Sequence, residues 1–268
     1  MRRLAMLAFA FAPVALAAQS PASTDSSLGI MLSFERFADI FGSRLVAAFD
    51  SIPASRYDYR PTPAQQTIGF IAQHVEGANY GLCEQFSELR HRPSSKDSLP
   101  PDVKARWPKD TLVARLEASL RFCDSALDRV PRLESPGLTS TLLAFETDLA
   151  EHYSQVAAYM RLLGMVPPSA LPPLARTAIT LPASAVAPLA GAYQLKPGVQ
   201  VEVTNRDGAL FVRSSLGGSA VRLWPESPTE FFVKEVDARI TFTHDASGRV
   251  MGLVLHQYGR DRAAQKIR

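Results

Sequence analysis

The spacing of apolar residues changes partway along this chain of 268 residues, and that change constrains the fold more than any other feature. From about residue 31 to residue 164, apolar side chains recur every three or four positions, which is the period of an amphipathic α-helix. This pattern predicts four helices, near 34–49, 65–89, 110–127 and 139–163. Four amphipathic helices of this length favour an up-and-down four-helix bundle.

A proline-rich segment at 167–188 separates this half from a half with a different period. Its six Pro predict a stiff, extended linker. Beyond it, apolar and polar residues alternate and turn signals recur, which is typical of short β-strands. The strands are expected near 190–195, 199–204, 209–215, 219–224, 229–234, 239–244, 249–256 and 263–267. An antiparallel barrel leaves no exposed edge in so small a sheet, and a sandwich is the alternative.

We therefore expect an α+β protein of two domains, with the bundle at 31–166 and the eight-stranded barrel at 189–268. The barrel half carries 11 Lys and Arg and 8 Asp and Glu, whereas residues 18–188 carry 16 and 18. These small opposite charges favour docking of the two domains. The net charge of the whole chain, +3, is too small to indicate a nucleic-acid partner.

Residues 1–17 have the parts of a secretory signal peptide. Arg2 and Arg3 precede an apolar run at 4–16, and the small-x-small sequence at 15–17 is followed by polar residues. The 13 apolar residues are too few to span a bilayer as a helix. We expect an exported protein, periplasmic or secreted, with no membrane attachment after cleavage. An uncleaved N-terminal anchor is the alternative.

The two cysteines, Cys83 and Cys123, both lie within predicted helices. In an oxidising compartment such a pair is a candidate disulfide that joins two helices. The bond would close a loop of about 40 residues and add ~3–4 kcal/mol of stability. Two buried thiols are the alternative, because the sequence does not fix which helix faces meet.

Three polar residues of the helical half form a candidate metal site. Asp148 and His152 are four positions apart, so they lie about 40° apart on one helix face. His74 lies on another predicted helix in an apolar segment, where an imidazole needs a polar partner. Two His and one carboxylate bind Zn, Ni, Fe(II) or Mn and leave positions open for water or substrate. A hydrogen-bonded polar trio without metal is the alternative.

Segments around these residues resemble the DinB family. One is YDYRPTP at 57–63 followed by TIGFIAQH at 67–74, and the other is EHYSQ at 151–155 followed by YMRLLGMVPP at 159–168. The resemblance covers about 31–168 and implies a four-helix bundle in which three His hold a divalent ion. His74 and His152 match the first and the last of these His, while Asp148 stands where the family usually has the middle one.

The barrel half resembles the lipocalin-like domain appended to beta-lactamase-related serine hydrolases. The likeness lies in LAGAY at 189–193, VQV at 199–201, GAL at 208–210 and TEFF at 229–232. The sequence has no S-x-x-K or G-x-S-x-G motif, so the mechanism of those hydrolases does not carry over. Such a barrel has room for one small apolar ligand or for its own side chains. The candidate lining residues are Phe211, Trp224, Phe231 and Phe242.

These features lead to two functional hypotheses. The first is an exported, DinB-like metal-dependent enzyme, either a hydrolase or a thiol-type transferase, with a divalent ion held by two His and one Asp. The residues expected to orient its substrate are Tyr153, Tyr159 and Arg161. The second is a non-catalytic small-molecule-binding or interaction protein that uses the barrel or the interdomain cleft. Both monomer and dimer are compatible with the sequence.

Overall fold

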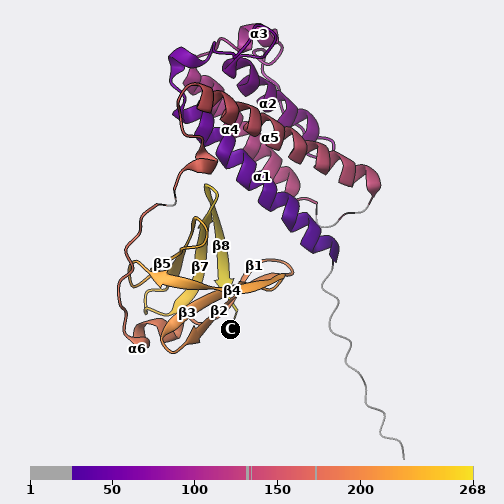
Figure 1. Cartoon of the computed structure of the whole chain (residues 1–268). Coiled ribbons are helices and arrows are strands. Elements are labelled where there is room, and N and C mark those ends of the chain that lie inside the picture. Colours follow the sequence, from indigo (N-terminus) through magenta and orange to yellow (C-terminus); the bar gives the residue numbers. More distant parts are fainter. Residues whose placement is uncertain (1–25, 131–132, 134, 173, 268) are drawn as a thin grey trace, which may run out of the picture.

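A computed structural model describes residues 26–130, 133, 135–172 and 174–267, which form a helical domain followed by a β-barrel (Figure 1). We call residues 26–166 the helical domain and residues 183–267 the barrel domain. The described helices are α1 (Ser26–Ser51), α2 (Ile68–Cys83), α3 (Pro101–Lys104), α4 (Lys109–Leu127), α5 (Pro136–Leu162) and α6 (Ala183–Val186). Short 3₁₀ turns occur at Ala54–Arg56, Pro168–Ala170 and Ala187–Leu189.

Local side-chain chemistry explains where α2 and α5 begin and where α5 ends. The Thr67 hydroxyl accepts a hydrogen bond from the Phe70 amide at 3.2 Å, and Ser135 caps α5 through the Leu138 amide at the same distance. Gly164 has a φ of 74°, the left-handed conformation that commonly follows the last helical residue. The sequence therefore places these three boundaries through its capping residues.

The second helix is shorter than the apolar pattern predicted, because α2 ends at Cys83 and not near residue 89. The Arg90 guanidinium donates to the carbonyl oxygens of Glu84 and Ser87 at 3.0 and 2.9 Å, which satisfies these groups outside a helix. Phe86 still packs on the core. The apolar spacing after Cys83 therefore indicates buried side chains and not a continuing helix.

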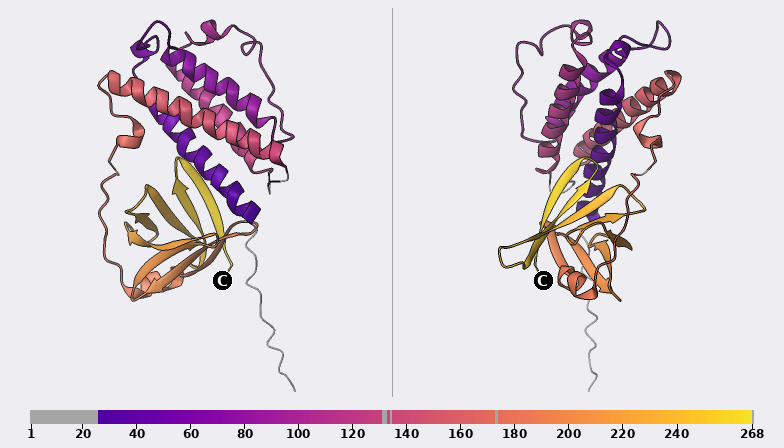
Figure 2. Two further views of the ribbon diagram at one scale, coloured as in Figure 1. Left: turned by 45° about the vertical axis from the view of Figure 1, so that its right-hand side comes forward. Right: turned by 90° about the vertical axis from the view of Figure 1, so that its left-hand side faces the viewer.

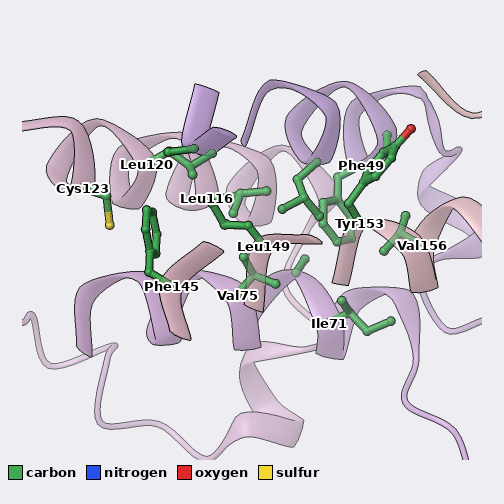
Figure 3. Packing of buried hydrophobic residues seen from close by; sticks show 14 of the residues in the cluster. Phe49, Ile71, Val75, Leu116, Leu120, Cys123, Phe145, Leu149, Tyr153 and Val156 are labelled. Atoms are coloured by element: carbon green, nitrogen blue, oxygen red, sulfur yellow. The ribbon is translucent and has the colours of Figure 1, made fainter. Parts of the chain in front are cut away.

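The four long helices α1, α2, α4 and α5 pack around one apolar core (Figure 3). Each of α1 and α2 contacts both α4 and α5. Phe49, Ile71, Leu116 and Leu149 each come from a different one of these helices and are fully buried. Burial of such side chains contributes roughly 1.5–3 kcal/mol each, which makes this core the main source of stability in the helical domain.

The Cys83–Cys123 disulfide joins the end of α2 to α4 and confirms the predicted pairing. The two Cα atoms lie 5.3 Å apart, and 40 positions separate the cysteines along the chain. A buried hydrogen bond of 2.9 Å from the Asn79 side-chain amide to the Ser119 hydroxyl lies between the same two helices. The contact between α2 and α4 is therefore fixed by covalent and polar links as well as by packing.

The proline-rich segment is not an extended linker along its whole length. Its last residues form α6 and a 3₁₀ turn, and Val186 and Leu189 are buried in the barrel core. The Ile179 amide donates to the carbonyl oxygen of Pro225 on the barrel at 2.9 Å. The segment folds onto the barrel because its aliphatic side chains bury apolar surface there.

The barrel domain is a closed sheet of eight antiparallel strands in sequence order, as the alternating pattern predicted. Closure occurs where β1 pairs with β8, with Tyr193 opposite Lys266. Every strand then has two neighbours, so the sheet has no unpaired edge. The strands are β1 (Gly191–Lys196), β2 (Val199–Arg206), β3 (Ala209–Ser214), β4 (Gly217–Pro225), β5 (Glu230–Val233), β6 (Ala238–His244), β7 (Val250–Gln257) and β8 (Arg260–Lys266).

Two of the four aromatic residues expected to line the barrel lie inside it. Phe231 and Phe242 are buried in the barrel core with their ring centroids 5.4 Å apart, edge to face. A third ring, that of Tyr193, lies 5.9 Å from Phe242. These aromatic side chains fill part of the barrel core.

The other two aromatic residues, Phe211 and Trp224, lie on the outer face, contrary to the prediction. They directly follow Leu210 and Leu223, which are buried in the core, and successive side chains of a strand point to opposite faces. The Nζ atom of Lys234 lies 3.6 Å from the centroid of the Trp224 ring. The period-two pattern locates the strands, but an aromatic residue on either face satisfies it.

The barrel domain docks on α1, and the contacts join acidic residues of the helix to basic residues of the barrel (Figures 1 and 2). Glu35 pairs with Lys196 of β1, and Asp39 pairs with both Arg260 and Arg262 of β8. Asp39 is only 3% exposed. These ion pairs agree with the opposite net charges expected for the two halves.

The predicted signal peptide, residues 1–17, lies outside the described residues. In the part of the chain that the structure describes, no helix has both the length and the apolar character needed to cross a bilayer.

Candidate metal centre

His74 lies near the middle of α2 and faces α5. Its ring is 4.8 Å from that of His152, centroid to centroid, and stacks on Phe70 one turn earlier on its own helix at 6.5 Å. The His74 side chain is 42% exposed. It therefore borders solvent on one side while facing α5 on the other.

Asp148 and His152 lie on successive turns of α5, on the face directed toward α2. The Nε2 atom of His74 is 4.0 Å from Oδ1 of Asp148, and Nδ1 of His152 is 3.5 Å from the same oxygen. One candidate ligand atom from each residue lies within 4.8 Å of the other two. The structure thus brings together the three residues that the sequence singled out.

The orientation of the His152 ring is set by its own helix. Its Nδ1 atom lies 2.8 Å from the backbone carbonyl oxygen of Asp148. A carbonyl oxygen only accepts hydrogen bonds, so Nδ1 carries a hydrogen and Nε2 is the ring nitrogen left to bind an ion. A contact of this kind, on the ring nitrogen that does not bind the ion, is typical of metal-ligating His.

Burial shifts the pKa values of two of these residues toward their neutral forms. Burial raises the pKa of Asp148, while the neighbouring His152 and His74 lower it. Burial also lowers the pKa of His74, and the nearby His152 lowers it further. Oδ2 of Asp148 is buried and has no hydrogen-bond partner among the described residues. A cation among the three side chains would compensate for the lost hydration of this carboxylate.

The residues present fit a divalent transition-metal ion. They offer two imidazole nitrogens and one carboxylate oxygen. Among the described residues, neither Oδ2 of Asp148 nor Nε2 of His152 has a hydrogen-bond partner, so both are available. Three protein ligands leave coordination positions for water or substrate. Zn, Ni, Fe(II) and Mn all accept this donor set.

The three residues expected to orient substrate do not join the cluster. The Tyr153 hydroxyl accepts from the Ser169 amide at 2.8 Å, and its ring packs on α1 because one residue turns the helix by about 100°. The Tyr159 hydroxyl donates to the carbonyl oxygen of Gln66 at 3.3 Å. Arg161 is exposed near the end of α5. Both tyrosines therefore stabilise packing, which corrects the expectation.

Two further carboxylates lie on α5, and the spacing argument gave neither a role. Both oxygens of Glu146 are buried without a partner among the described residues, and burial, followed by the charge of Asp39, raises its pKa to about 8. Glu146 faces α1, away from the cluster. Glu151 is exposed, and its charge raises the pKa values of both His74 and Asp148. The burial of Glu146 and the effect of Glu151 on the cluster become visible only once α1 and α2 are packed on α5.

Comparison with known proteins gives a match for the barrel. The family described as a domain of unknown function (DUF3471) matches residues 175–266, which include the barrel and the segment that folds onto it. No curated protein matches the chain. Like the structure, the match joins the end of the proline-rich segment to the barrel. The description of the family names no activity.

Proposed function

We propose that this protein is a metal-dependent enzyme of the DinB-like type, in which His74, Asp148 and His152 hold one divalent ion. The main support is the convergence of three ligand atoms from two helices within 4.8 Å. The resemblance of residues 31–168 to the DinB family, with a four-helix bundle as scaffold, supports the same interpretation. The barrel, in its likeness to a lipocalin-like domain, is a separate module in this proposal.

A bound divalent ion would lower the pKa of a coordinated water or thiol and so supply a nucleophile near neutral pH. The side chains divide the remaining work. Asp148 supplies negative charge, and the carbonyl of the same residue holds the His152 ring at 2.8 Å. His74, with 42% of its side chain exposed, lies at the side from which a substrate reaches the cluster.

Hydrolysis is the reaction class that we propose, with transfer to a thiol as the alternative. The signal-peptide pattern at 1–17 and the Cys83–Cys123 disulfide both support export to a periplasmic or extracellular compartment. Reduced low-molecular-weight thiols are scarce in an oxidising compartment, whereas water is abundant. Export therefore favours water as the nucleophile.

Metal analysis of the purified full chain tests this proposal. Mass spectrometry of the protein, prepared without chelators, should find about one equivalent of a divalent transition metal in the wild type and at least tenfold less in His152→Ala. His244→Ala is the matched control, because His244 is exposed at the end of β6 in the barrel. This control should retain the metal, and circular dichroism should show that both variants are folded.

Two results would overturn the proposal. One is a wild-type protein that purifies without metal and gains no thermal stability when Zn, Ni or Mn is added. The other is equal loss of metal from His152→Ala and His244→Ala, which would place the ion elsewhere on the chain.

A further inference from the structure

The barrel contains a cavity at the end that faces the helical domain. Its volume is about 590 Å³, within the range of roughly 300–1,000 Å³ typical of small-molecule sites. Inward-facing residues of β2, β3, β4, β5, β6 and β7 line it, and most are aliphatic. Those that form the apolar wall are Val199, Val201, Val212, Val221, Val233, Ile240, Leu253 and Leu255.

The helix α1 lies across one end of the barrel (Figure 2), and Leu32 and Arg36 of this helix line the cavity. Two hairpin turns of the barrel contact α1. Gly198, in the β1–β2 turn, lies so close to Leu28 that a Cβ atom there would be 2.9 Å from the leucine side chain. At Gly259, in the β7–β8 turn, a Cβ atom would lie 3.9 Å from the Ser43 side chain, which is an ordinary van der Waals contact. The cavity lining therefore includes residues of both domains.

The opposite side of the mouth is open. Gly217 and Ser219, at the start of β4, are exposed, and Val236 between β5 and β6 is 41% exposed. These residues line the same cavity and belong to the β3–β4 and β5–β6 hairpins. A small molecule can enter between these hairpins and the helix.

Charged groups at the rim are mostly neutralised by one another. Lys196 pairs with Glu35, and Arg262 pairs with Asp39. Arg36 of α1 also lines the cavity, is exposed, and has no carboxylate partner among the described residues. Asp128, directly after α4, is an exposed carboxylate in the same lining. An aliphatic cavity with an unpaired guanidinium at its mouth is complementary to a molecule with an apolar body and an anionic head.

We propose that this cavity binds a small amphiphilic carboxylate, with its alkyl chain inside the barrel and its carboxylate at Arg36. This specifies the small-molecule hypothesis for the barrel and does not depend on the metal centre. The ligand would contact the barrel through its chain and the helical domain through its head. It would thereby strengthen the docking of the two domains.

A series of alkyl carboxylates tests the proposal on the full chain by isothermal titration calorimetry, below their micelle concentrations. Affinity should rise roughly fourfold per methylene from hexanoate until the cavity is filled. Decanoate should bind more tightly than decanol or decylamine. Arg36→Gln should weaken decanoate binding about tenfold while leaving decanol binding nearly unchanged. Arg121→Gln, on the exposed face of α4, is the control and should bind like the wild type.

Filling the cavity gives a second, independent test. Val221→Trp places a large ring inside the barrel and should abolish binding of every chain length, with circular dichroism confirming that the strands remain. Arg36 lies on the surface, so we expect Arg36→Gln to fold. This variant therefore still tests the proposal if Val221→Trp unfolds. The proposal is wrong if decanoate does not bind the wild type, if decylamine binds more tightly, or if Arg36→Gln weakens decanoate and decanol equally.

Discussion

The Nδ1 atom of His152 lies 2.8 Å from the backbone carbonyl oxygen of Asp148, one helical turn earlier. One residue thus serves the cluster twice, because its carboxylate faces His74 while its carbonyl orients the second imidazole. The distance depends on uninterrupted helical geometry at this point of α5. A rigid helix is a better support for such a site than a loop, since side chains of a helix have few alternative positions.

Replacing Asp148 by Asn should weaken metal binding at least tenfold. The substitution keeps the size of the side chain and the helix but removes the charge of the proposed ligand. Loss of a group that only supports a ligand already costs about tenfold or more in metal affinity, so loss of a ligand should cost at least as much. Competition against a chromogenic chelator measures the dissociation constant. Thr147→Ala, an exposed neighbour on the same helix, should behave like the wild type. Equal affinities for Asp148→Asn and the wild type would show that Asp148 is not a ligand.

Removing the disulfide should lower the free energy of unfolding by about 4 kcal/mol, because the closed loop of 40 residues restricts the unfolded chain. The double variant Cys83→Ala/Cys123→Ala is compared with the wild type by urea denaturation followed by far-ultraviolet circular dichroism. Adding a reductant should destabilise the wild type by a similar amount and leave the double variant unaffected. A wild type insensitive to reductant would contradict the prediction.

Asp39→Asn should loosen the contact between the domains. Asp39 is 3% exposed and pairs with Arg260 and Arg262, so its loss leaves two partly buried guanidinium groups without this carboxylate. We expect a cost of about 2 kcal/mol and a larger radius of gyration in small-angle X-ray scattering. Glu117→Gln removes an exposed ion pair with Arg121 and serves as the control. Identical scattering curves for Asp39→Asn and the wild type would contradict this role.

Stability should depend on pH through Asp124. Burial, the largest influence, raises the pKa of this carboxyl to about 6, although Arg260 lowers it in part. Between about pH 4 and pH 6, the Asp124 carboxyl is therefore protonated in the native state and ionised in the unfolded state. Its contribution to the free energy of unfolding declines as the pH rises through this window. The free energy of unfolding of Asp124→Asn should therefore rise above that of the wild type by up to about 3 kcal/mol between pH 4 and pH 7.

Urea denaturation of the Asp124→Asn variant and of the wild type across this pH range measures the difference. The gain should be near zero at pH 4 and level off above pH 6. A constant difference at every pH would show that Asp124 does not titrate in this window.

The secondary structure was largely readable from local chemistry. The end of α5 before the left-handed Gly164 and the alternation that predicts the strands depend on neighbouring residues only. The starts of α2 and α5, capped by Thr67 and Ser135, each lie three positions from the predicted 65 and 139. The spacing of apolar residues gave wrong predictions where a side chain is buried outside a helix or faces outward from a strand. Phe86 packs on the core outside any helix, and Trp224 fits the strand pattern while facing outward.

The sequence by itself predicted helices followed by eight strands, because the period of apolar residues depends only on spacing along the chain. The closure of the strands into a barrel and the Cys83–Cys123 bond were each one of two alternatives until the tertiary structure decided them. The sequence also identified His74, Asp148 and His152 as a candidate set. Only the tertiary structure decided that their ligand atoms converge and that Tyr153 faces α1. It alone showed that Leu32 and Arg36 of α1 line the barrel cavity. Such contacts join residues far apart in the sequence, and they depend on how helices and strands pack, which no local pattern encodes.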